Sequence, residues 1–137
     1  MTEVSIAWRG AFTNEEIHAL HAVAFGTRLF TAEEWNWVEQ VERYSLGWVV
    51  ARDPGGRFVG FANVLWDGSV HAFVEDVMVD ESVRHCGVGV RVVHAARDGA
   101  TAAGCEYLHV GFDDELREFY VDACGFEPTG GGLIELG

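Results

Sequence analysis

Residues 77–93, VMVDESVRHCGVGVRVV, join an apolar, strand-like run to two glycines that open a helix-like run. A helix leaves its first backbone N–H groups without partners, and such groups bind phosphate oxygens well. Gly87 and Gly89 carry no Cβ, so a bulky anion can approach the main chain closely. Arg84 and Arg91 add positive charge nearby. The segment therefore predicts an anion-binding turn, with a ligand-free strand-to-helix turn as the alternative.

Two common phosphate-binding motifs are excluded. The dinucleotide motif GxGxxG needs a third glycine or an alanine, and Val92 stands at that position after Gly87 and Gly89. The P-loop motif ends in GK[ST], and the chain has no such triplet. Neither a Rossmann nor a P-loop nucleotide site is expected.

Composition and net charge limit the classes of ligand and partner that are possible for this chain. With 137 residues, 49% of them hydrophobic and 23% charged, the chain is expected to form one globular domain over residues 1–137. The formal net charge of −13 excludes a general nucleic-acid binder, which gathers Lys and Arg on one face. The charge either favours cationic partners through its long-range field or serves only solubility.

Other features lead us to expect a cytoplasmic protein without a membrane partner. No apolar run approaches the roughly 20 residues that span a bilayer. The start MTEVSIAWRG lacks the basic and apolar regions of a signal peptide. The cysteines are odd in number and scattered, which argues against a disulfide framework or a CxxC metal site: Cys86, Cys105 and Cys124.

The turn must be positioned by the elements around it. Alternation and turn signals predict strands over residues 4–8, 46–53, 57–68, 69–80 and 107–112, with one or two short strands in residues 125–136. Capping signals and helical periodicity predict helices from Thr13 or Asn14 to Gly26, from Thr31 onward, over 87–103 and over 113–124. This order predicts an α+β fold with one embedded βαβ unit.

The same region resembles a known family. RHCGVG, residues 84–89, is similar to the [RQ]xxGx[GA] signature of the GNAT superfamily of acyl-CoA-dependent N-acetyltransferases. VMVDESVR before it, and GCEYLHV and LREFYVDACGF after it, resemble further elements of that family in the same order. The resemblance covers about residues 70–129 and implies a GNAT-like mixed, mostly antiparallel sheet with helices on both faces.

The resemblance implies acetyl-CoA as co-substrate and no metal. Two sets of main-chain groups would hold it. The first set would bind the diphosphate of coenzyme A: Arg84, His85, Cys86, Gly87, Val88 and Gly89. The second would pair with the pantetheine arm as if it were an added strand: Val77, Met78 and Val79.

It also implies a catalytic base on the strand before the turn. Glu75 is the first candidate, because related amine acetyltransferases often carry an acid four residues before the valine matched by Val79. His71 is the second, since it shares the strand face of Glu75 and an unperturbed histidine pKa of about 6.5 suits a base. Asp76 is expected on the opposite face unless a β-bulge intervenes. An acid at the sheet rim and an ordinary histidine near a turn are the alternatives.

Tyr120 lies where family members often have a tyrosine that protonates the departing thiolate. The family spacing is FYxxxGF, and VDAC adds one residue here. An extra helical residue would rotate Tyr120 by about 100°, which leaves a structural tyrosine as the alternative.

One tryptophan pair and one histidine pair are the remaining candidate site residues. Trp35 and Trp37 lie where the superfamily builds its acceptor pocket, and aromatic walls suit an amine, although helical spacing also fits core packing. His18 and His21 are three residues apart without an evident third metal ligand, so we expect a surface pair.

These features together predict an N-acetyltransferase that uses acetyl-CoA and a small-molecule amine, favoured to be basic, in a ternary complex. A homodimer is compatible with the resemblance. The alternative is a non-catalytic GNAT-fold domain that binds coenzyme A as a sensor or interaction module. The two differ in whether Glu75 or His71 faces a polar pocket.

Overall fold

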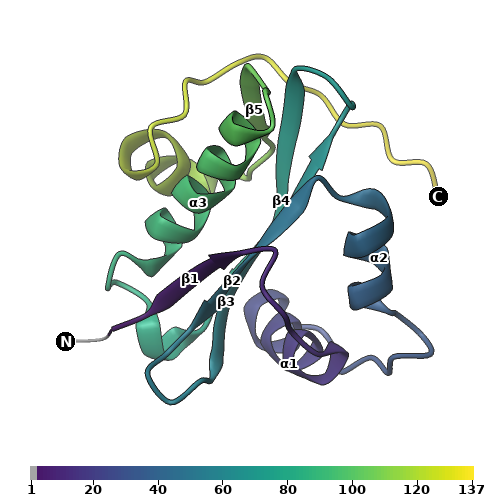
Figure 1. The fold of residues 1–137 in the computed structure, drawn as a ribbon. Helices are drawn as coiled ribbons and strands as arrows, with labels where there is room; N and C mark the ends of the chain where they lie inside the picture. Colours follow the sequence, from purple (N-terminus) through teal and green to yellow (C-terminus); the bar gives the residue numbers. More distant parts are fainter. Residues whose placement is uncertain (1–2) are drawn as a thin grey trace.

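The computed structural model describes residues 3–137 and has three layers, with a central sheet between two layers of helices (Figure 1). The strands follow the chain across the sheet: β1 (Ser5–Trp8), β2 (Gly47–Arg52), β3 (Phe58–Trp66), β4 (His71–Val79) and β5 (Tyr107–Val110). The first three pairings are antiparallel and β4 pairs with β5 in parallel. The predicted mixed, mostly antiparallel sheet is confirmed.

Helices α1 (Asn14–Phe25) and α2 (Trp37–Tyr44) cover one face, and α3 (Val88–Ala102) covers the other (Figure 1). Helix α1 begins with the predicted capping box, in which the Thr13 hydroxyl accepts from the Glu16 N–H at 3.1 Å and a Glu16 carboxylate oxygen accepts from the Thr13 N–H at 3.0 Å. Helix α3 buries Val92, Val93, Ala96 and Ala100 along one stripe, whereas Ala103 just beyond the helix is exposed.

The helix expected from Thr31 begins six residues later. Thr31 and Glu34 form the predicted capping contacts, but these close only one turn. Helix α2 is instead capped by Asn36, whose side-chain oxygen accepts from the Glu39 N–H at 3.0 Å. The side-chain oxygen of Asn14 accepts from the Trp37 N–H at 2.7 Å, so α1 anchors the start of α2.

The helix expected over residues 113–124 is two shorter segments, a 3₁₀ turn (Asp114–Leu116) and a π-helix (Glu118–Ala123). The Cys124 N–H donates to the Phe119 carbonyl at 2.9 Å, a bond that spans five residues. A π-turn is wider than an α-turn, so it accommodates the extra residue in FYVDACGF. Tyr120 stays buried, packed against Phe112 and Phe126.

The short strands expected after residue 125 are absent from the described chain, and residues 125–137 are irregular. Three consecutive glycines, Gly130–Gly132, lose much conformational freedom when they enter a strand, which disfavours pairing. This segment leads away from the π-helix and crosses above the sheet toward the side of α2 (Figure 1).

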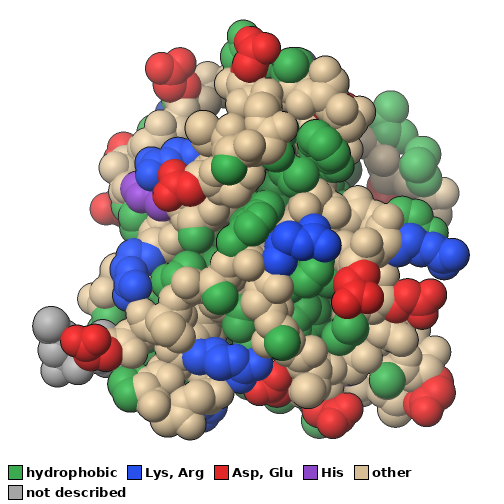
Figure 2. Space-filling view, viewed as in Figure 1, with side chains coloured by type: hydrophobic (Ala, Val, Ile, Leu, Met, Phe, Trp, Pro, Cys, Tyr) green, Lys and Arg blue, Asp and Glu red, His purple; other side chains and the backbone are tan. Residues whose placement is uncertain are grey.

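The surface is predominantly acidic, as the charge of −13 requires. Figure 2 shows hydrophobic side chains gathered in the middle of one view, with most acidic side chains toward its outline. No helix in residues 3–137 has the length and apolar character needed to cross a bilayer.

Candidate active site

A β-bulge interrupts β4 at Asp76. The register with β3 shifts between Phe61 and Asn63, and Asp76 adopts a left-handed backbone with φ 56°. Side chains therefore change faces across the bulge: Val74 packs in the core beneath α3, whereas Met78 packs in the core beneath α1. Whether a bulge interrupts this strand was left open by the sequence. The structure contains one, and it brings Asp76 beside Glu75 rather than to the opposite face.

The two neighbouring carboxyl groups have different surroundings. Partial burial raises the pKa of Glu75, and the Asp76 charge raises it further. Burial also raises the pKa of Asp76, but a hydrogen bond from Asn63 and the charge of His21 oppose that rise. Everything that acts on Glu75 thus favours its protonated form, whereas Asp76 has partners that favour the anion.

Asn63 is a polar residue in the middle of an apolar strand and is only 1% exposed. Its Nδ2 donates to the Asp76 carboxylate at 3.3 Å, and its Oδ1 accepts from the Ser45 hydroxyl at 2.5 Å. The sequence analysis missed Asn63 and Ser45. The single amide within FVGFANVLW was the available signal, because a buried amide requires partners.

The predicted anion-binding turn connects β4 to α3. Residues 81–83 form a 3₁₀ turn, His85 and Gly87 have left-handed φ values of 65° and 77°, and α3 begins at Val88 without a side-chain cap. A Cβ added at Gly87 would meet no atom within 4 Å, so the space in front of the turn is open. The first-turn N–H groups of α3 are therefore available to an anion.

The second glycine of the turn has a different role. A Cβ on Gly89 would lie 3.0 Å from the Phe119 ring, so this glycine allows the π-helix to pack on the start of α3. Arg84 and Arg91, the predicted positive charges, both bond to the main chain as well: Arg84 Nε donates to Val79 O at 3.3 Å and Arg91 to Val4 O at 2.9 Å.

The edge of β4 that leads to this turn is open. Pairing between β4 and β5 runs only from His71 to Val74 on β4, so residues 75–79 have no strand partner on that side. The opening includes Val77, Met78 and Val79, which were predicted to pair with pantetheine. An extended ligand chain that starts at the turn can follow this edge as far as Glu75.

Tyr120 lies on the π-helix, within electrostatic range of Glu75 at the far end of this opening. Burial, together with the Cys124 and Glu75 charges, raises its pKa to about 12. The phenol is therefore protonated at neutral pH and able to donate to a nearby acceptor.

His71 lies on the paired part of β4, four residues or about 13 Å from Glu75 along the strand. Its Nδ1 is 2.9 Å from His109 Nε2, and its ring stacks on Tyr107 at a centroid distance of 5.2 Å. The structure thus separates His71 from Glu75, the open edge and the turn.

The two histidines of α1 pack against the two tryptophans at the start of α2: His18, His21, Trp35 and Trp37. His18 is buried, not on the surface as expected, and its Nε2 is 2.9 Å from Trp35 O. Trp37 is fully buried and stacks on Trp35 at 4.4 Å, so it serves the core. His21 is half-buried on α1; burial lowers its pKa, while the Asp76 charge acts in the opposite sense.

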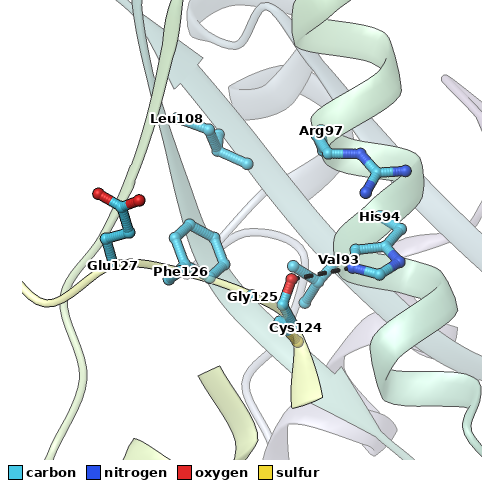
Figure 3. Close-up of a pocket in the computed structure, with 8 residues that line it drawn as sticks. All are labelled: Val93, His94, Arg97, Leu108, Cys124, Gly125, Phe126 and Glu127. Carbon is cyan, nitrogen blue, oxygen red and sulfur yellow. Dashed lines mark hydrogen bonds between the residues drawn. The ribbon is translucent and has the colours of Figure 1, made fainter. Parts of the chain in front are cut away.

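A separate surface pocket of about 310 Å³ lies between α3, β5 and the residues after the π-helix (Figure 3). Val93, His94 and Arg97 line it from α3, and His94 Nε2 is 3.0 Å from Cys124 O. None of the predicted site residues lines this pocket. Within residues 3–137 no group of three or more ligating side chains is placed to hold a metal ion.

Comparison with known proteins identifies the fold and the family. The profile of the "Acetyltransferase (GNAT) family" matches residues 12–126. The probable glucosamine 6-phosphate N-acetyltransferase 2 of Oryza sativa subsp. japonica is 42% identical over 57 residues, which is 42% of this chain and 34% of that protein. The chain thus matches about a third of the length of this curated relative.

Solved structures share the fold over nearly the whole chain. Glucosamine-6-phosphate N-acetyltransferase from Arabidopsis thaliana superimposes with a TM-score of 0.76 and 19% identity, covering 96% of this chain and 98% of its own. An aminoglycoside N-acetyltransferase in complex with CoA gives 0.77 and 18% identity, with coverages of 100% and 96%. At these identities the likeness concerns the fold.

Proposed function

Because the chain belongs to the GNAT family of acetyltransferases, we propose that it transfers an acetyl group from acetyl-CoA to an amine within a ternary complex. The observation that supports this most strongly is the alignment of three features on one path. An uncapped helix start, an open strand edge and a carboxylate pair follow one another from Gly87 to Glu75.

The residues present fit acetyl-CoA, which supplies an acetyl thioester. The N–H groups of residues 85–89 would bind the diphosphate, and the open space at Gly87 admits it. The Arg84 N–H, which was expected to take part, already donates to the Glu81 carbonyl at 3.2 Å. The main chain of Val77, Met78 and Val79 binds the pantetheine amides by strand-like hydrogen bonds. The reactive end then lies at the bulge, between Glu75 and Tyr120.

Glu75 is the proposed proton acceptor. The acceptor amine arrives as an ammonium ion and gives one proton to Glu75, directly or through a water molecule, which frees its lone pair. The nitrogen forms a bond to the carbonyl carbon, the carbon–sulfur bond breaks, and the nitrogen loses its second proton to solvent as the neutral amide forms. Tyr120 donates a hydrogen bond or a proton to the leaving sulfur and regains its proton from solvent. One proton is released overall when a protonated amine is acetylated.

The acceptor class follows from charge and from the relatives. Glu75 and Asp76 place two carboxyl groups at the proposed reaction centre of a chain with a net charge of −13, which favours a cationic amine. Proteins similar to this chain carry the names of a glucosamine 6-phosphate and an aminoglycoside N-acetyltransferase. Amino sugars are therefore the first acceptors to test.

The test of coenzyme binding is thermal unfolding with acetyl-CoA. A ligand at 100 times its Kd stabilises the folded state by about 2.7 kcal/mol, so Tm should rise by several degrees. Gly87→Glu should abolish the rise, because it adds bulk and negative charge to the phosphate site. Gly130→Glu, the same change in the exposed C-terminal segment, should keep it.

The test of catalysis is release of free thiol from acetyl-CoA across a panel of amino sugars, polyamines and amino acids. A thermal shift without thiol release would instead support the coenzyme-binding module. The proposal would be contradicted if millimolar acetyl-CoA produced no thermal shift and no amine released free thiol.

A further inference from the structure

A hydrogen-bonded track joins Ser45, Asn63 and Asp76, in which Asn63 is buried and the two outer residues are half-buried. Asn63 is 1% exposed in the central strand β3, where burial of an amide is costly unless both of its ends are bonded. Both ends are bonded here, at 2.5 Å to Ser45 and 3.3 Å to Asp76. A valine or alanine at this position would extend the apolar pattern of β3, so packing does not account for Asn63.

The Ser45 hydroxyl orients the amide. Because it donates to Oδ1, the Asn63 NH₂ group is left to face Asp76. A flipped amide would place its carbonyl oxygen against the carboxylate. The arrangement therefore favours the charged form of Asp76 and holds it in the left-handed conformation at the bulge.

The charged groups around Asp76 come from two elements. Glu75 is its neighbour on β4, and His21 faces it from α1, with His18 acting on His21 from the same helix. Tyr120 from the π-helix interacts with Glu75. Within residues 3–137 the Glu75 carboxyl group makes no hydrogen bond, in contrast to that of Asp76. Two adjacent carboxyl groups with unequal environments are suited to two different tasks.

We propose that Asp76 is a fixed anion that holds the ammonium group of the acceptor and tunes Glu75 as the base, and that Asn63 and Ser45 are its positioning residues. This division of labour rests on the proposed acetyl transfer. A fixed anion at this position selects a cationic acceptor, because an uncharged hydroxyl acceptor would leave the Asp76 charge unpaired at the site.

The first experiment is Asp76→Asn, because asparagine tolerates the left-handed backbone of the bulge. With the anion removed, KM for a cationic amine should rise about tenfold, the loss expected for a charge-assisted bond, while kcat changes much less. The acid limb of the pH–rate profile should move to lower pH, because Glu75 no longer has a like charge beside it. Asp98→Asn, which removes an exposed charge on α3, should change neither.

The second experiment does not depend on activity. Carboxyl NMR titration of the free protein should show the pKa of Glu75 falling in Asp76→Asn. It should show the pKa of Asp76 rising in Asn63→Ala, and rising less in Ser45→Ala. Should Asn63→Ala fail to fold, Ser45→Ala carries the same test with a smaller change.

Three results would overturn the inference. Loss of kcat in Asp76→Asn together with retained kcat in Glu75→Gln would make Asp76 the base. An unchanged Glu75 pKa in Asp76→Asn would remove the tuning, and an unchanged Asp76 pKa in both Asn63→Ala and Ser45→Ala would remove the positioning. If no amine is acetylated, the proposed function fails, while the titrations still decide whether the track sets these carboxyl pKa values.

Discussion

At the scale of single residues, the proposed chemistry depends on which group holds a proton at neutral pH. Burial raises the pKa of both Glu75 and Asp76, but of these two carboxyl groups Asn63 donates a hydrogen bond to Asp76 alone. Tyr120 has a pKa of about 12 and stays neutral. The proposed site thus combines a base with increased proton affinity and an anion on β4 with a phenolic donor from the π-helix.

Tyr120→Phe tests the phenolic donor. The ring packing against Phe112 and Phe126 is kept, so the fold and KM for acetyl-CoA should be unchanged. Loss of the donor should lower kcat about tenfold or more. Tyr107→Phe at the exposed ring on β5 is the matched control, and steady-state thiol release is the measurement.

Equal kcat values for Tyr120→Phe and wild type would assign the hydroxyl a structural role. Because the pKa is about 12, ionisation of this tyrosine should not reduce wild-type activity below a pH of about 10.

At the scale of elements, small irregularities place the functional groups. The bulge in β4 turns Asp76 toward α1, and the π-helix takes up one extra residue so that Tyr120 stays inside. Close packing of glycines against rings then sets the distances between layers. The Trp8 ring of β1 lies between Gly47 on β2 and Gly99 on α3, and side chains at either glycine would collide with it.

Gly99→Ala tests this contact between α3 and the sheet. Alanine is favoured over glycine in a helix by about 1 kcal/mol, yet its Cβ would lie 2.5 Å from the Trp8 ring. We expect net destabilisation of about 1–3 kcal/mol, measured by urea unfolding. In a Trp8→Ala background the same change should be neutral or stabilising, because the ring is gone. Destabilisation of equal size in both backgrounds would contradict the packing argument.

At the scale of the whole molecule, charge acts on the two substrates in opposite ways. The net charge of −13 would attract the proposed cationic acceptor at long range and would repel anionic coenzyme A, a repulsion that the local N–H groups, Arg84 and Arg91 would offset. Raising NaCl from about 20 to 300 mM shortens the screening length severalfold. KM for the amine should therefore rise while KM for acetyl-CoA stays level or falls.

Initial rates at both salt concentrations provide the measurement, with NaCl replaced by KCl as a control for specific ions. Parallel changes of both KM values would show that the acidic surface serves solubility and not substrate attraction.

Much of the architecture could be predicted because its causes are local. Alternation in β1, the turn signals around β2–β4, the Thr13 capping box and the α3 stripe are set by neighbouring residues, and the signature around residues 84–89 is a contiguous motif. Three predictions were wrong: the helix start at Thr31, the regular helix over residues 113–124 and the strands after residue 125. The outcome at these places depends on competing caps, an inserted residue and the absence of a strand partner, respectively.

The sequence by itself determined the family, the order of the elements from β1 to β5 and the position of the glycine turn between β4 and α3, since each depends on residues close together in the chain. Only the tertiary structure decided which polar groups meet. Ser45, Asn63, Asp76 and His21 come from four separate segments, and a one-residue bulge reverses the side to which Asp76 points. Such a reversal costs little locally and is settled by the partners across the sheet, which sequence periodicity does not record.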